Sequence, residues 1–246
     1  MAKPSKDKDR RAVVEQLRRE QQRKERRRTL TMVGAAAGVG LLIIGLAVYG
    51  YLDNTREERE LAGADLADIG VSADAASCTD PVAEKATGSA DHRQPGSVIK
   101  YAAAPPAYGP HYPDWAPLSK KFYAPGERPE VAQLVHNLEH GYNILWYDET
   151  IADDEDALAA VRQIAGKFPG NEFVNKFIAA PWTAEDGPAF PDGAHVALTH
   201  WSMGDTNGNP AGQHGITQYC GAPSGEVVEA FVEDYPYTDS PEPGAS

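Results

Sequence analysis

The sequence predicts an α/β or α+β domain, with helices flanking a mixed β-sheet, preceded by one N-terminal transmembrane helix. Three observations lead to this prediction. An uncharged apolar block lies near the N-terminus, strand-like apolar runs alternate with amphipathic helices further on, and two cysteines bracket those runs. Charge divides the chain in the same places, because residues 1–28 carry a net charge of +7 and residues 53–246 a net charge of −20.

Residues 29–52 form the uncharged block. At 1.5 Å per helical residue, the 23 residues from Leu30 to Leu52 match a hydrocarbon core of about 30 Å. A signal peptide would have a shorter apolar core of about 7–15 residues, so we expect a retained transmembrane helix. By the positive-inside rule, residues 1–28 are a cytoplasmic basic arm and the C-terminal part is extracytoplasmic. The predicted localisation is therefore the cell membrane, with a single pass.

The expected partners follow from this topology. The basic arm directly precedes the membrane, which favours attraction to anionic lipid, at about 1 kcal/mol per basic residue, over binding of nucleic acid. The outer part has no recognisable nucleic-acid module. An envelope protein is the partner expected if the outer domain is an interaction module.

Cys78 and Cys220 are the only cysteines, and both lie in the predicted outer part. Oxidising surroundings favour a disulfide between them over two separate buried thiols. The pair nearly spans the region expected to fold, residues 78–236. A juxtamembrane linker (53–77) precedes this region, and a tail poor in apolar residues (237–246), predicted to be disordered, follows it.

Seven elements are expected in the outer domain. Apolar residues at three- and four-residue spacing from Val131 to Leu138 predict a helix that ends at Gly141. Before it, residues 103–129 form a Pro-, Gly- and Tyr-rich loop that packing or a ligand must order. Further helices are expected at Asp153–Lys167 and Glu226–Tyr235, and strands at Ser97–Tyr101, Tyr142–Tyr147, Phe177–Ala180 and His195–Trp201.

The resulting order is β-α-β-α-β-β-α, which is also the order of a thioredoxin-like core. The chain has no C-x-x-C motif, so this order gives no support to thiol redox catalysis. The thioredoxin-like arrangement is one option within the predicted mixed sheet.

The segment His136-Asn137-Leu138-Glu139-His140-Gly141 holds three potential metal ligands. On a helix, positions i, i+3 and i+4 share one face, so His136, Glu139 and His140 should converge. With His111 from the Pro-rich loop they form a candidate transition-metal site, for which copper or zinc is the expected cofactor. His200 and Met203 are candidate additional ligands, and a thioether would favour copper. The remaining histidines, His92, His195 and His214, receive no role.

Two alternatives remain for the same residues. His-x-x-Glu-His matches the inverzincin motif of metal-dependent hydrolases, with Glu139 activating water. However, Gly141 ends the helix at once and no second helix offers an obvious acidic ligand, so we favour a binding module over an enzyme and expect no catalytic residue. The other alternative is a structural hydrogen-bond network that fixes the Pro-rich loop in an envelope interaction domain.

Two strings also carry a resemblance to a known family. Pro105-Pro106-x-x-Gly109-Pro110-His111 and the later His136–Gly141 segment, followed by an aromatic strand, resemble the signatures of the domain of unknown function 3105 family. The flanking cysteines and the single N-terminal anchor are similar to that family too. The resemblance covers roughly residues 78–235. The chain departs from the family's usual Thr-Ser at Ala107-Tyr108, and the resemblance implies no activity.

Overall fold

The structure is a computed structural model, and its description covers residues 63–87, 91–204 and 212–245, with isolated positions between 15 and 48. The chain divides into two compact units, Met1–Arg59 and Glu60–Ser246, and the second contains the folded domain. The predicted transmembrane segment, residues 29–52, lies outside the described residues except at isolated helical positions. Within the described part of the chain, no helix is both long and apolar enough to cross a membrane.

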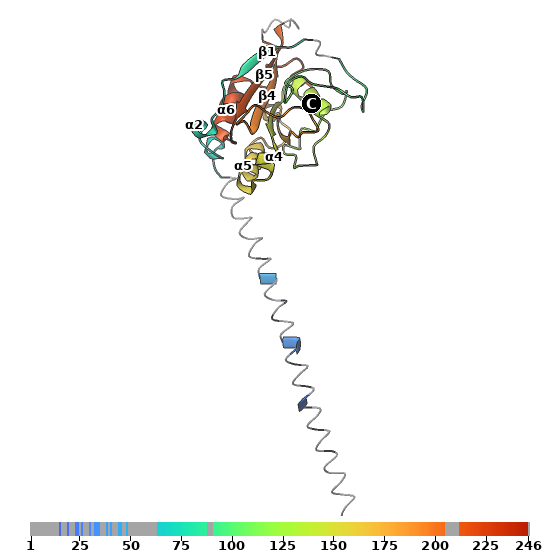
Figure 1. The fold of residues 1–246 in the computed structure, drawn as a ribbon, viewed down its shortest axis with the longest axis vertical. Coiled ribbons are helices and arrows are strands. Elements are labelled where there is room, and N and C mark those ends of the chain that lie inside the picture. The colour runs from blue at the N-terminus through green and yellow to red at the C-terminus, as the bar shows by residue number, and fades with distance from the viewer. Residues whose placement is uncertain are drawn as a thin grey trace, which may run out of the picture. The chain divides into compact units, whose positions relative to one another are not determined.

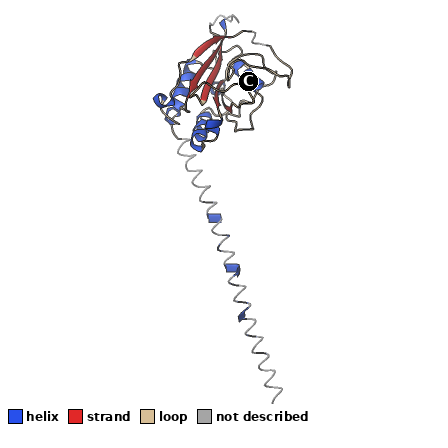
Figure 2. Cartoon of the chain, viewed as in Figure 1, coloured by secondary structure: helices blue, strands red, loops and turns tan. Residues whose placement is uncertain are grey.

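A five-stranded mixed sheet forms the centre of the domain, in the order β1-β5-β4-β2-β3. Figure 1 labels its first three strands, β1, β5 and β4. β2 and β3 are parallel, and the other neighbouring strands are antiparallel. The sheet, with helices on both of its faces (Figure 2), confirms the predicted mixed sheet flanked by helices. The strands are β1 (Val82–Lys85), β2 (Asn143–Tyr147), β3 (Phe177–Pro181), β4 (Val196–Ser202) and β5 (His214–Cys220).

The longer helices begin where side chains cap their free N–H groups. Asp154 accepts hydrogen bonds at the start of α5, Ser224 does so at the start of α6, and Glu130 and Gln133 form a capping box on α3. The helices are α2 (Ala73–Ala76), α3 (Val131–Glu139), α4 (Glu149–Ala152), α5 (Glu155–Gly166) and α6 (Gly225–Asp234), with 3₁₀ turns η1 (Leu66–Asp68) and η2 (Phe173–Asn175).

Each face of the sheet has its own hydrophobic core. Along β2, Leu145 and Tyr147 pack in the core shared with α5 and α6, while Ile144 and Trp146 pack in the core shared with α3. Successive side chains of a strand point to opposite faces, so a strand covered on both sides is apolar throughout. This explains why Tyr142–Tyr147 could be recognised as a buried strand from its sequence.

Several predictions for the edges of the fold were wrong. Residues 97–101 form no strand, and Val98 is 86% exposed. The sheet instead gains β1, a fully exposed edge strand, and β5. The described part of the predicted linker also belongs to the domain, because Ile69 and Ala76 are buried in its core.

A disulfide joins Cys78 to Cys220 and confirms the predicted pairing. Its partners are 142 residues apart in sequence, so the bond links the start of the domain to the end of β5. Loop closure of this length contributes up to about 5 kcal/mol to stability in the chain-entropy model.

The segment after α6 is ordered through Ala245, in contrast to the predicted disordered tail. Asp239 accepts hydrogen bonds from Ser202 Oγ (2.7 Å) and the Met203 amide (3.2 Å), and Ser240 is buried. Lys176 Nζ donates to the carbonyls of Pro243 and Ala245 at 2.9 and 2.6 Å. These polar contacts, together with the packing of Tyr237 against Phe173, hold a segment whose last residues are poor in apolar side chains, which explains why its composition suggested disorder.

Candidate metal centre

Helix α3 presents two potential ligand side chains because its other face is anchored in the core. Leu134 and Leu138 are fully buried among the residues that pack on the sheet. His136 and Glu139 lie three residues apart, so they point to the same side of the helix. Both are buried, with exposed fractions of 3% and 4%, which places a carboxyl and an imidazole where little water reaches them.

Asn137 ties the Pro-rich loop to α3. Its Oδ1 accepts a hydrogen bond from the Ala116 amide (2.8 Å), and its Nδ2 donates to the Ala116 carbonyl (2.9 Å). A fully buried amide satisfied in this way positions the loop backbone against the helix. The loop was predicted to need packing or a ligand to be ordered, and Asn137 provides part of that packing.

Backbone carbonyls fix the tautomers of two histidines. His111 Nδ1 lies 2.8 Å from the Gly109 carbonyl oxygen, and His136 Nδ1 lies 2.6 Å from that of Tyr112. A carbonyl can only accept, so both Nδ1 atoms carry a hydrogen and donate it. In a neutral ring Nε2 is then an unprotonated nitrogen with a free lone pair, as a metal ligand requires.

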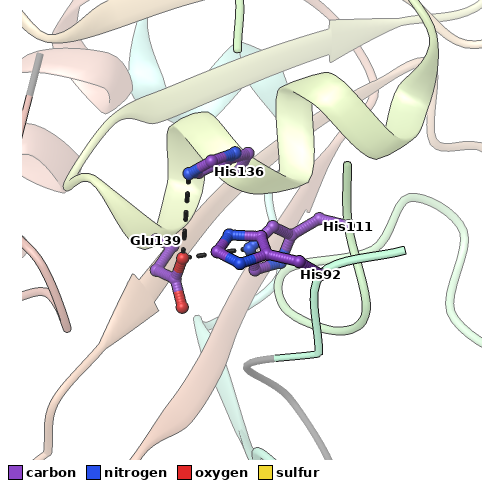
Figure 3. A group of neighbouring side chains, drawn as sticks. All are labelled: His92, His111, His136 and Glu139. Carbon is purple, nitrogen blue, oxygen red and sulfur yellow. Dashed lines mark ion pairs between the residues drawn. The ribbon is translucent and has the colours of Figure 1, made fainter. Parts of the chain in front are cut away.

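The Nε2 atoms of both rings lie near one carboxylate oxygen. Figure 3 shows Glu139 and His136 on neighbouring turns of α3, with His111 approaching from its loop. Glu139 Oε2 is 3.0 Å from His111 Nε2 and 4.0 Å from His136 Nε2. Among the described residues His111 Nε2 makes no hydrogen bond that meets the geometric criteria, although it lies close enough to Glu139 for one. Two lone-pair atoms this close repel each other unless a proton or a cation lies between them.

His92 completes the group, and sequence reasoning missed it. The four-residue cluster of His92, His111, His136 and Glu139 has donor atoms that all lie within 4.8 Å of one another. Backbone pairing brings His92 there, since the Arg93 amide donates to the His111 carbonyl at 2.7 Å. The side chain of His92 is exposed, whereas the other three are buried. No sequence spacing signals this contact between two irregular segments.

The electrostatics of the cluster favour a neutral His136 beside an ionised Glu139. Burial and the nearby His111 lower the pKa of His136, although the hydrogen bond to Tyr112 opposes the change. Burial by itself would raise the pKa of Glu139, but His111, His136 and His92 outweigh it and bring the pKa below its usual value. At neutral pH His136 therefore offers a free lone pair and Glu139 a negative charge.

His140 lies outside the four-residue cluster and belongs to a second one. The three-residue cluster of Glu139, His140 and Glu242 also has its donor atoms within 4.8 Å of one another. Burial and the adjacent His136 lower the pKa of His140 to about 4, so this ring is neutral at pH 7. The predicted ligands thus lie together, with Glu139 common to both clusters.

His200 and Met203 are held elsewhere. His200 Nε2 donates to the Asp239 carbonyl at 2.6 Å, and Met203 Sδ accepts from Gln213 Nε2 at 3.6 Å. Among the described residues, His200 belongs to no group of His, Cys, Asp and Glu side chains that could hold a metal. The structure therefore gives no support for a thioether ligand, on which the preference for copper rested.

The comparison with protein families identifies the relationship that the two signature strings suggested. The family model described as "Protein of unknown function (DUF3105)" matches residues 92–246. The chain belongs to this family. The match confirms the expected membership. The matched residues include every member of the four-residue cluster and of the three-residue cluster. No curated protein and no solved structure matches the chain.

Proposed function

We propose that this DUF3105 chain is a transition-metal-binding module whose site is the four-residue cluster. One observation carries the proposal. The Nε2 atoms of His111 and His136, whose rings are oriented by Nδ1–carbonyl hydrogen bonds, both lie within 4.0 Å of the same Glu139 oxygen. A divalent cation among these atoms would turn their mutual repulsion into attraction.

The donor set indicates the kind of ion. Three imidazoles and one carboxylate suit zinc or Cu²⁺, whereas Cu⁺ prefers softer sulfur ligands. Three of the donors are buried and one, His92, is exposed, so an ion can reach the site from the side of His92. The Gly109 and Tyr112 carbonyls orient the two rings, as hydrogen-bond acceptors on the second ring nitrogen commonly do for histidines that bind metals.

A hydrogen-bond network is the main alternative, with a protonated histidine in place of the ion. The hydrolase alternative needs His136 and His140 to hold one ion, whereas the four-residue cluster contains His136 without His140. Both alternatives remain predictions, and the experiment below separates the first of them from metal binding.

The decisive experiment measures metal content and thermal stability together. Chelator-stripped protein is loaded with Zn²⁺ or Cu²⁺, passed through a desalting column, and assayed for bound metal and melting temperature. The parent should retain metal, and an ion at 100 times its Kd should add about 2.7 kcal/mol to the free energy of unfolding. The His111→Asn/His136→Asn variant should lose both effects, while His214→Asn, outside both clusters, should keep them.

Fluorescence gives a second measurement of the same event. The Trp115 ring lies edge-on to His136 and His140, with centroid distances of 5.0 and 4.8 Å. Cu²⁺ at the cluster should therefore quench Trp115, and Trp115→Phe should reduce the quenching, with a remainder from Trp201, whose ring centroid lies 6.0 Å from that of His111. Melting temperatures that fall in the double variant, with no effect of metal on the parent, would instead establish the hydrogen-bond network.

We also propose that residues 29–52 anchor the chain in the membrane, with the metal-binding domain outside the cell. Leu30, Met32 and Val33 support this proposal because they are 60–71% exposed, as apolar side chains facing lipid would be. Protease added to intact cells should digest the domain and leave residues 1–28 protected. A chain released from membranes by alkaline carbonate would contradict the anchor.

The strand arrangement supports the finer fold prediction as well. The parallel pair β2 and β3, connected through α5, is followed by the antiparallel pair β4 and β5 and then by α6. We propose that these elements form a thioredoxin-like core with β1 added at the edge. An experimental structure that superposes on thioredoxin-like proteins through these elements would test this proposal.

A further inference from the structure

The three-residue cluster is a separate group of donors at the end of α3. His140 is the C-cap residue of this helix, and Glu242 comes from the segment after α6. His140 Nε2 lies 3.7 Å from Glu242 Oε2, which is longer than a hydrogen bond between these atoms. The remaining member, Glu139, also belongs to the four-residue cluster.

Backbone contacts hold the two chain segments together at this point. The Glu242 amide donates to the Glu139 carbonyl at 2.9 Å, which places the Glu242 side chain beside the helix end. Lys176 Nζ donates to the His140 carbonyl (2.7 Å) and also to the carbonyls of Pro243 and Ala245. The position of Glu242 therefore depends on the fold and not on an attraction between the cluster's own side chains.

His140 is a buried ring with an unsatisfied nitrogen. The residue is 2% exposed, and its Nδ1 has no hydrogen-bond partner within the described part of the chain. A buried polar atom without a partner is rare and costs about 1–3 kcal/mol. The unsatisfied atom is Nδ1, whereas the nitrogen beside Glu242 is Nε2, so it is Nε2 that faces the carboxylate.

We propose that Glu139 bridges two divalent cations, one in the four-residue cluster and one held by Glu139, His140 and Glu242. This inference rests on the proposed function, because it adds a second ion to the same site. Glu139 has two carboxylate oxygens, and bridging carboxylates are well suited to joining two cations at short range. The second ion has three protein donors, so it keeps coordination positions open to water or to a small anionic ligand.

The exposure of the two sites differs in a way that distinguishes their roles. Glu242 is 58% exposed, whereas the histidine and Glu139 beside it are buried. Solvent therefore reaches the second ion from the side of Glu242. The first ion, with four protein donors, is the more enclosed of the two.

The test counts Zn²⁺ ions bound to the full-length chain. Stripped protein in mild detergent is equilibrated with Zn²⁺, separated from free ion by gel filtration, and analysed for metal per chain. The parent should bind two ions and Glu242→Gln one. Glu229→Gln, which changes the charge equally at an exposed position of α6, should still bind two. The His111→Asn/His136→Asn variant should lose the enclosed ion.

The possible outcomes separate this inference from the proposed function. One ion in the parent, unchanged by Glu242→Gln, overturns the second site and leaves the first intact. Two ions in both the parent and Glu242→Gln place the second ion elsewhere and also overturn the inference. No ion in the parent overturns the proposed function itself.

Electron paramagnetic resonance with Cu²⁺ alone adds a measurement that stoichiometry does not provide. Two Cu²⁺ ions that share a carboxylate are magnetically coupled, so the parent should give a weakened or split signal. Glu242→Gln should give the full signal of an isolated ion, and Glu229→Gln the coupled signal. An isolated-ion signal from the parent at two ions per chain would overturn the bridge.

Discussion

Acidification should lower the free energy of unfolding of the metal-free protein, because His140 is buried in its neutral form. Burial and repulsion from His136 lower its folded-state pKa from 6.5 to about 4. Between these values the unfolded chain binds a proton that the folded chain does not, so the free energy of unfolding falls as the pH falls. Each pH unit within this window costs up to about 1.4 kcal/mol, which amounts to about 2 kcal/mol at pH 5.

Urea unfolding at pH 7, 6, 5 and 4.5 measures this loss. The His140→Asn variant cannot take up the proton, so its stability should fall by about 2 kcal/mol less than that of the parent between pH 7 and 5. Comparing the slopes cancels any change that the substitution makes at every pH. His214→Asn serves as the control histidine and should follow the parent. Equal losses in the parent and in His140→Asn would refute the reasoning.

Two further predictions concern the frame around the clusters. Replacing Cys78 and Cys220 by Ser should lower the free energy of unfolding by up to about 5 kcal/mol in denaturant titrations, whereas a loss below about 1 kcal/mol would contradict the loop-entropy argument. Gly141 has a positive φ (92°), which costs an L-residue such as Ala roughly 1–2 kcal/mol. Gly141→Ala should destabilise the domain by more than this, because the new Cβ would clash with the Tyr237 carbonyl oxygen and lie 2.7 Å from Ser240 Oγ. An unchanged melting temperature would contradict this close contact.

The elements that could be predicted from the sequence are those whose burial follows from a local pattern. The 3/4 spacing from Val131 to Leu138 identifies α3, and the continuous apolar run from Tyr142 to Tyr147 identifies β2. β1 (Val82–Lys85) was not predicted. It is an exposed edge strand, so it has no buried face and its sequence shows no alternating apolar pattern. β5 carries His214 and Gly215 at its start, which obscures its pattern.

The candidate site was predictable where its ligands share one helix, and for His111 in the Pro-rich loop before that helix. His136, Glu139 and His140 follow from helical spacing, but the helix places them in two clusters. His92 reaches the site through backbone pairing with His111, and Glu242 through a hydrogen bond from its amide to Glu139. Contacts made by the main chain between distant irregular segments leave no pattern in the side chains, so neither residue could be found in advance.

The position of the disulfide has a consequence for the biosynthesis of the domain. β2, β3, β4 and most of β5 lie between Cys78 and Cys220, so Cys78 is made well before its partner. With only two cysteines, the chain offers Cys78 no wrong partner within itself during that interval. Premature oxidation can only join two separate molecules. A monomer with a closed disulfide is therefore a chain whose whole sheet has already been synthesised.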